Sequence, residues 1–193
     1  MRLTLIALGG AALAACSGNN PSANALEPGT YGLGRAPTAA EVAEVDIDAA
    51  PNGHGLPSGS GTAAQGAALF RTQCAGCHGD KGQGMAPVFP ALIGRDTASE
   101  GFRFASDPKL VKTIGNYWPY ATTIFDYVRR AMPHTAPGSL TNDQVYALTA
   151  YLLAANQVIP DGATLDSARL VRVQMPYHDR FVPDDRRGGP TVR

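Results

Sequence analysis

Two cysteines and a histidine, Cys74, Cys77 and His78, are the residues of this sequence best spaced to do chemistry. Two thiols three positions apart on a helical turn can form thioethers with the two vinyl groups of one haem. The histidine that follows then lies beneath the iron and can donate an imidazole nitrogen as the proximal ligand. The pattern therefore predicts one covalent haem c, held by Cys74 and Cys77, with His78 as a metal ligand.

Other uses of a Cys-x-x-Cys pair fit this sequence less well. A thioredoxin-like redox disulfide is disfavoured because no alternation of strands and helices surrounds the pair. A structural zinc site would need a second pair of ligands at suitable spacing, which the sequence lacks. The chain has three cysteines in all, and the third, Cys16, lies far from this pair.

The iron needs a second axial ligand from elsewhere in the chain, and Met132 is the preferred candidate. It ends a predicted helix, precedes a proline, and lies just before the last predicted helix. Met85 lies seven residues after His78 and would have to pass around the edge of the ring to reach its opposite face, and Met175 lies in an irregular tail. His134 is the best substitute and would give bis-histidine coordination. A methionine buried in the core is the alternative for Met132.

Histidine–methionine ligation predicts one-electron transfer. A thioether ligand favours ferrous iron and raises the reduction potential. With both axial positions filled, oxygen or peroxide cannot easily bind, and the iron keeps its ligands in both oxidation states. A haem enzyme or sensor with a displaceable Met132, and a thiol lipoprotein without haem, are the alternatives from other classes.

The elements that must position these residues are predicted to be helices. The sequence predicts helices at residues 62–73, 109–114, 121–131 and 141–156, and a short one at 38–45. Thr38 and Thr141 each precede a glutamate or glutamine by three residues, which is capping-box spacing. No convincing strand pattern or internal repeat is found. The predicted fold class is all-α, with a small helical monohaem domain at residues 60–158.

The segments on either side of this domain are predicted to be irregular. The chain has 22 Gly and 15 Pro among 193 residues, and residues 16–59 resemble a Gly/Pro-rich tether and strap. Residues 159–193 form a C-terminal extension too short to be a domain. The formal net charge is zero, which argues against nucleic-acid binding.

The first residues predict export and a lipid anchor. Arg2 precedes a short apolar run, and residues 1–15 are too short to span a bilayer stably. Residues 13–15 followed by Cys16 have the pattern of a bacterial lipobox, which predicts lipidation of Cys16 and anchoring on the periplasmic side of a membrane. Ordinary secretion with an incidental cysteine is the alternative.

Four features resemble class I cytochrome c over about half of the chain. Gly66 and Phe70 precede the haem motif, Met132 precedes a proline, and Tyr151 lies in the last predicted helix. In that family, a glycine and an aromatic residue of the first helix cross the last helix closely. The resemblance implies a contact of Gly66 and Phe70 with Tyr151.

A narrower resemblance covers most of the chain. The matching stretches are residues 31–35, 46–48, 55–57, 115–121, 125–127, 129–133 and 173–176. They resemble the cytochrome subunit of Sox-type sulfane dehydrogenase, whose partner is a molybdenum-cofactor subunit related to sulfite oxidases. Members of that family can carry two haem motifs, whereas this chain has one. The resemblance implies that the chain accepts electrons from such a partner. A sulfite dehydrogenase or another related molybdoenzyme as the partner is one alternative, and a general membrane-tethered shuttle to other cytochromes or a terminal oxidase is another.

Three aromatic residues within this resemblance are expected to bind the cofactor. Tyr117, Trp118 and Tyr120 would line the haem pocket, with their polar atoms available to a propionate. No residue of this chain is predicted to be catalytic, because the sulfur substrate would react on the partner.

Overall fold

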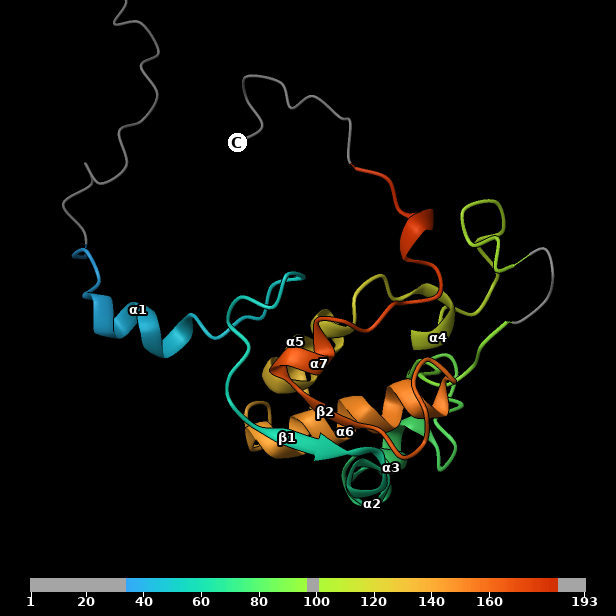
Figure 1. The fold of residues 1–193 in the computed structure, drawn as a ribbon, viewed down its shortest axis with the longest axis horizontal. Helices are drawn as coiled ribbons and strands as arrows, with labels where there is room; N and C mark the ends of the chain where they lie inside the picture. The colour runs from blue at the N-terminus through green and yellow to red at the C-terminus, as the bar shows by residue number, and fades with distance from the viewer. Residues whose placement is uncertain (1–33, 97–100, 184–193) are drawn as a thin grey trace, which may run out of the picture.

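The computed structural model describes residues 34–96 and 101–183. The elements in chain order are α1 (Ala39–Val45), β1 (Ser60–Thr62), α2 (Ala63–Gln73), α3 (Ala75–His78), α4 (Ile114–Tyr117), α5 (Ala121–Ala131), α6 (Asn142–Ala155), β2 (Thr164–Asp166), α7 (Ser167–Leu170) and the 3-10 helix η1 (His178–Arg180) (Figure 1). The predicted all-α class is confirmed, with a two-stranded sheet added. Among the described residues, no helix is long and apolar enough to span a membrane. The predicted signal peptide and Cys16 lie outside this part of the chain.

The helix α6 forms the centre of the core, because most of its residues are buried. It packs against α2, α4, α5 and both strands. A helix that is buried on nearly all sides belongs to the interior of a protein. The neighbouring α5 buries one face only: Ile124, Phe125 and Val128 are buried, whereas Tyr127 and Arg130 are exposed.

The helices α2 and α6 cross at very short distance, and Gly66 permits this approach. A Cβ atom at position 66 would lie 1.9 Å from the carbonyl oxygen of Ala147, far inside contact distance. Beside the crossing, the ring centroids of Phe70 and Tyr151 lie 5.0 Å apart, a favourable separation for aromatic pairs. The predicted contact between the first and last helices of the haem domain is confirmed. In Figure 1, α2 is seen along its axis, below α6.

Three helices begin with a capping box, in which two side chains satisfy the free backbone N–H groups of the first turn. The pairs are Thr38 with Glu41, Thr62 with Gln65, and Thr141 with Gln144. The two boxes predicted from the sequence are confirmed, and the third has the same spacing. An N-cap typically contributes about 1 kcal/mol to helix stability, which explains why these helices begin where the sequence predicts.

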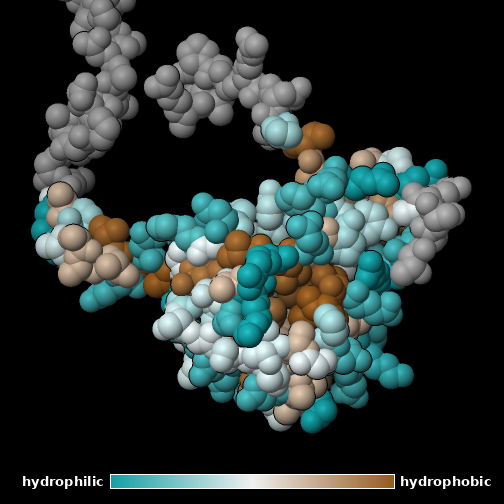
Figure 2. Space-filling view, in the orientation of Figure 1, coloured by the Kyte–Doolittle hydropathy of each residue, from teal (hydrophilic) through white to brown (hydrophobic). Residues whose placement is uncertain are grey.

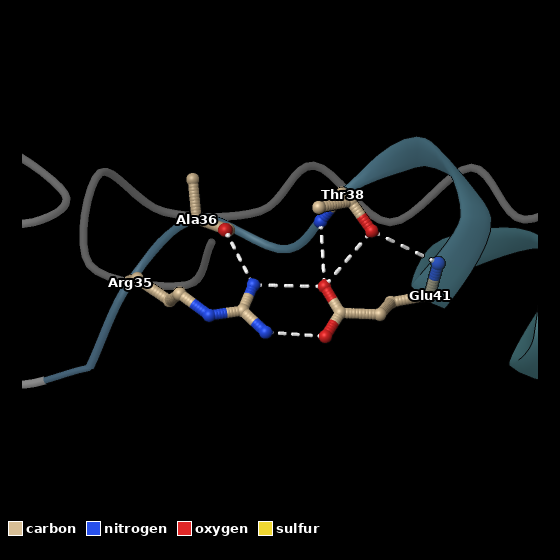
Figure 3. Close-up of polar contacts among 4 residues, drawn as sticks. All are labelled: Arg35, Ala36, Thr38 and Glu41. Carbon is tan, nitrogen blue, oxygen red and sulfur yellow. Dashed lines mark hydrogen bonds and ion pairs between the residues drawn. The ribbon is translucent and has the colours of Figure 1, made fainter.

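The capping box of α1 is extended by an ion pair. Arg35 pairs with the Glu41 carboxylate through both Nη atoms, and Glu41 also accepts the backbone N–H of Thr38 at 2.8 Å (Figure 3). These bonds favour the charged carboxylate and lower the pKa of Glu41 to about 2, with Arg35 as the largest cause. Since α1 has no buried residue, these local bonds, rather than core packing, hold the helix.

The predicted helix at residues 109–114 is wrong, because the chain forms turns before α4 begins. The Asp107 side chain accepts the N–H of Lys109 at 2.9 Å and closes a local turn. Thr113 is the N-cap of α4, and its hydroxyl accepts the N–H of Asn116 at 3.3 Å. The capping threonine, not the hydrophobic spacing, sets the start of this helix.

The antiparallel pair β1–β2 was not predicted from the sequence. Ser60 pairs with Asp166 at one end of this pair. Each strand has three residues, too few to show an alternating pattern. Gly61 lets β1 lie directly on α6, because a Cβ there would lie 2.3 Å from the backbone nitrogen of Ala147.

Part of the C-terminal segment that was expected to be irregular belongs to the core. Leu170 and Met175 are almost fully buried and join the main hydrophobic cluster. The Tyr177 hydroxyl accepts the buried N–H of Phe102 at 2.8 Å. This segment therefore ties the region before α4 to the rest of the fold. The division of the chain at residue 158 stays a prediction.

Gly66→Ala is expected to destabilise the haem-loaded protein. The added methyl group would push α2 away from α6, and overpacking of this kind costs about 1–3 kcal/mol. Thermal unfolding followed by circular dichroism measures the loss. Gly162→Ala is the matched control, since nothing lies within 4 Å of a Cβ at that position. Equal melting temperatures for the two variants would contradict the close crossing.

Candidate functional site

The Cys-x-x-Cys-His motif lies on α3, directly after α2. Cys74 occupies the junction, and its carbonyl accepts the N–H groups of Cys77 at 3.1 Å and His78 at 2.9 Å. The turn ends at Gly79, whose φ of 77° favours glycine. The two thiols and the imidazole therefore belong to one helical turn, and α2 supports that turn.

Both thiols of the motif are free and half-buried. Burial raises the pKa of Cys74 to about 11, and the neighbouring Cys77 adds to this shift. Since the thiolate is the reactive form of cysteine, the Cys74 thiol is held in its less reactive protonated form at neutral pH. Within residues 34–96 and 101–183, no three His, Cys, Asp or Glu side chains gather into a metal-binding group.

One nitrogen of the His78 ring is already engaged by the protein. Its Nδ1 lies 3.0 Å from the carbonyl oxygen of Pro90. A carbonyl can only accept a hydrogen bond, so Nδ1 carries the proton and Nε2 keeps its lone pair. A bond of this kind fixes the orientation and raises the basicity of a metal-binding histidine. The geometry therefore fits His78 as an iron ligand through Nε2.

The loop after the motif closes on itself and holds Pro90 in place. The N–H of Gly84 donates to the His78 carbonyl at 2.7 Å, and the N–H of Leu92 donates to the Gly82 carbonyl at 2.8 Å. Sequence reasoning missed the role of Pro90 because a backbone carbonyl acts there, and its position depends on the folded loop.

The structure separates the candidates for the second axial ligand. Met175 is 5% exposed and belongs to the core cluster, whereas Met85 is 44% exposed and lies in the loop that closes against His78. His134 is exposed. Met132 is half-buried at the C-cap of α5. These positions favour Met132, whose role as ligand stays a prediction.

Of the three aromatic residues predicted to line the haem pocket, Trp118 packs against the hydrophobic core cluster. Its Nε1–H donates to the Thr123 hydroxyl at 2.7 Å, and its ring centroid lies 6.1 Å from that of Tyr127 on α5. The indole is therefore fixed by both its polar and its apolar atoms.

The rings of Tyr117 and Tyr120 contact the C-terminal segment. The centroid of Tyr117 lies 5.5 Å from that of Phe181, and the centroid of Tyr120 lies 4.9 Å from that of His178. Lys112 lies over the Tyr117 ring at 5.2 Å, within cation–π range. The two contacts with the C-terminal segment were not foreseen, because they join residues far apart in the sequence. The place of these rings in the haem pocket stays a prediction.

Comparison with known proteins agrees with this geometry. Residues 61–152 match the family described as cytochrome c oxidase, cbb3-type, subunit III. A chain in the crystal structure of the sulfane dehydrogenase SoxCD from Paracoccus pantotrophus is 41% identical with a TM-score of 0.69, and the match covers 80% of this chain and 73% of that one. The chain belongs to the class I c-type cytochromes. The resemblance to a Sox-type cytochrome is thereby confirmed.

The cytochrome is also similar to the thiosulfate dehydrogenase of Stutzerimonas stutzeri (strain A1501), with 27% identity over 160 residues. The match covers 80% of the cytochrome and 46% of that protein. The cytochrome therefore spans about half the length of this curated relative.

The cytochrome carries one haem c, since its family binds haem covalently and the sequence has a single Cys-x-x-Cys-His motif. Its residues fit the group: Cys74 and Cys77 present free thiols, and His78 presents a free Nε2. The haem supplies one-electron redox chemistry at its iron.

Replacing Cys74 and Cys77 together by alanine is expected to abolish covalent haem binding, because no thioether can form. Haem staining of a denaturing gel measures this loss. Cys16→Ala is the matched control from the same chain and should keep the stain. Haem loss in the control, or retention in the double variant, would contradict the assignment of the two cysteines.

Proposed function

We propose that the cytochrome accepts electrons from a molybdenum-containing catalytic subunit that oxidises a reduced sulfur compound. The observation that carries this proposal is the 41% identity, with a shared fold, to a chain of the sulfane dehydrogenase SoxCD. The sulfur substrate would react on the partner in a two-electron step. The cytochrome would take these electrons singly and pass them to another cytochrome or a terminal oxidase.

His78 and Met132 are the axial ligands in this proposal. The Pro90 carbonyl orients His78 at 3.0 Å, and Met132 ends α5, whose inner face is buried in the core. Both ligands therefore lie on elements that the fold holds firmly. Electron transfer then requires little rearrangement, and the thioether sulfur favours the ferrous state expected of an electron acceptor.

A second candidate function is supported by the similarity to thiosulfate dehydrogenase, in which case the cytochrome itself would oxidise thiosulfate. This support is weaker, because the identity is 27% and the cytochrome spans less than half of that protein. Two further alternatives are a general tethered shuttle and a haem sensor with a displaceable Met132. Haem reduction through the catalytic subunit separates the proposal from the first, and carbon monoxide binding separates it from the second.

The segment between α1 and β1 is anchored along α5 and α6, as expected for a strap that serves a fixed partner. Asp126 accepts the N–H of Ala49 at 2.8 Å. Arg129 donates to the carbonyl of Ile47 at 2.7 Å. The Tyr146 hydroxyl donates to the carbonyl of Pro57 at 2.8 Å. The helix α1 therefore extends from an anchored segment.

The exposed face of α1 is the proposed contact with the catalytic subunit. Val42 and Val45 are 41% and 78% exposed, and Figure 2 shows hydrophobic side chains of α1 open to solvent. Residues 35–60 contain four acidic residues and one basic residue, Arg35, which pairs with Glu41, so the segment is acidic. A short helix of this kind suits an apolar groove with a basic rim, whereas its acidic charge disfavours an anionic membrane.

The proposed place of action is the periplasmic side of a bacterial membrane. Residues 1–15 have the pattern of an export signal, and residues 13–15 precede Cys16 as in a lipobox. Lipidation of Cys16 would tether the cytochrome through several acyl chains, which anchor a protein stably where one chain does not. The strap would then connect the anchor to the haem-binding helices.

Met132→Ala is expected to remove the weak long-wavelength absorption of a ferric haem with a methionine ligand. It should also let carbon monoxide bind the ferrous iron, because the sixth position becomes free. Optical spectra of the oxidised and reduced holoprotein measure both effects. Met85→Ala is the matched control and should keep the wild-type spectrum.

An unchanged spectrum in Met132→Ala would contradict its ligation and would point to His134. Ready binding of carbon monoxide by the wild type would favour the enzyme or sensor function.

The haem is expected to be reduced by a sulfane compound only when the catalytic subunit is present, because the substrate reacts at molybdenum. Oxidised cytochrome is mixed with thiosulfate and the molybdenum subunit of the same organism, and the haem absorbance is followed by stopped flow. Reduction by thiosulfate alone would favour the second candidate function. Absence of reduction in every mixture, while dithionite still reduces the haem, would contradict the proposal.

The same assay tests the contact through α1. Val42→Asp combined with Val45→Asp should slow haem reduction about tenfold at limiting catalytic subunit, because two charges would enter an apolar groove. Val111→Asp is the control, since Val111 is 64% exposed and lies in the segment before α4, outside the strap and α1. If the double variant is reduced as fast as the wild type, docking through α1 is overturned, but electron transfer from the catalytic subunit is not contradicted.

A further inference from the structure

The side chain of Asn156, at the end of α6, is buried and fully hydrogen-bonded. It is 1% exposed. Its Oδ1 accepts the N–H groups of Gly94 at 2.9 Å and Gly115 at 3.2 Å. Its Nδ2 donates to the carbonyls of Leu92 at 3.1 Å and Leu152 at 2.8 Å. All four hydrogen-bonding positions of the amide are therefore used.

The four partners of Asn156 belong to three separate segments: the loop after the haem motif, the start of α4 and the last turn of α6. Two partners are donors and two are acceptors, so a primary amide matches all of them. A carboxylate could accept the two N–H bonds but could not donate to the carbonyls. A leucine of similar size would leave the N–H groups of Gly94 and Gly115 without a partner, whereas the carbonyls of Leu92 and Leu152 would each keep a backbone N–H donor.

Close packing around Asn156 keeps these segments together. A Cβ atom at Gly115 would lie 2.7 Å from the Asn156 Oδ1, so the amide reaches α4 only because position 115 is a glycine. The Thr113 hydroxyl also donates to the carbonyl of Gly94. The end of the haem-motif loop is therefore a fixed point of the fold.

This fixed point lies close to the group that orients the proximal histidine. Leu92 follows Pro90 by two positions, and the Pro90 carbonyl lies 3.0 Å from the His78 Nδ1. The N–H of Leu92 also donates to the carbonyl of Gly82 at 2.8 Å, which closes the loop at its base. A shift of Leu92 would therefore change the distance between Pro90 and the His78 ring.

We propose that Asn156 is a positioning residue for His78. Its amide fixes the loop at Leu92 and Gly94, and the loop holds the Pro90 carbonyl against the imidazole. A firm bond at Nδ1 makes the imidazole a stronger donor and favours ferric iron. Asn156 therefore helps to set the reduction potential from outside the haem motif. The inference rests on His78 being the iron ligand of the proposed function.

Asn156→Leu in the haem-loaded cytochrome should raise the reduction potential, because the Pro90 bond to His78 is weakened. Exchange of the His78 Nδ1 proton with solvent should become about tenfold faster, which corresponds to the loss of about one net hydrogen bond. Redox titration measures the potential, and NMR of the reduced protein measures the exchange. Asn156→Ser is the second variant if Asn156→Leu does not fold. The serine side chain is smaller than that of asparagine and leaves room for water.

Thr149→Val is the matched control on the same helix. Thr149 is fully buried, and its hydroxyl donates to the Val145 carbonyl at 2.8 Å within α6. The control should lower the melting temperature but leave the potential and the His78 proton exchange at wild-type values. If both Asn156 variants also lower the melting temperature but keep the wild-type potential and His78 proton exchange, the role of Asn156 is purely structural and the proposal is overturned. A wild type without an iron-bound histidine resonance would instead contradict His78 ligation itself.

Discussion

The arrangement of the cytochrome depends on the short distance between α2 and α6. Gly66 brings the backbone of α2 against the carbonyl of Ala147, so that no side chain separates the two helices at their crossing. The position of α2 in turn sets the position of α3, because the haem motif begins at its last turn. A shift at the crossing would therefore reach Cys74, Cys77 and His78 through rigid helical backbone. Helix packing and haem attachment are parts of one constraint.

Different segments hold the two parts of the proposed haem site. The core helix α6 ends at Asn156, which ties the haem-motif loop to α4. The strap before β1 binds α5 through Asp126 and Arg129, and α5 ends at Met132. The two sides expected to hold the iron are thus braced by different parts of the chain. Such bracing suits a protein whose metal should keep its ligands through repeated changes of charge.

Much of this organisation is readable from the sequence, where the signals are local. The Cys-x-x-Cys-His spacing, the threonine caps at residues 38 and 141, and the Gly66 crossing all depend on neighbouring residues or on a family pattern. Three other features depend on distant segments or on backbone atoms, so no local sequence pattern predicts them. They are the sheet of β1 and β2, the Pro90 bond to His78 and the four bonds of Asn156. The start of α4 was misplaced because a single cap at Thr113 outweighs hydrophobic spacing in a short helix.

The sheet of β1 and β2 also has a topological consequence. Because Ser60 pairs with Asp166, the chain enters and leaves the haem-binding helices at neighbouring points. Units whose ends lie side by side tolerate fusion and insertion, since added polypeptide need not cross the fold. Further modules can therefore be added beyond the strap or beyond the C-terminal segment that packs on the core without crossing the haem-binding helices. The match of the cytochrome to less than half of a longer relative is the pattern that such modular reuse would leave.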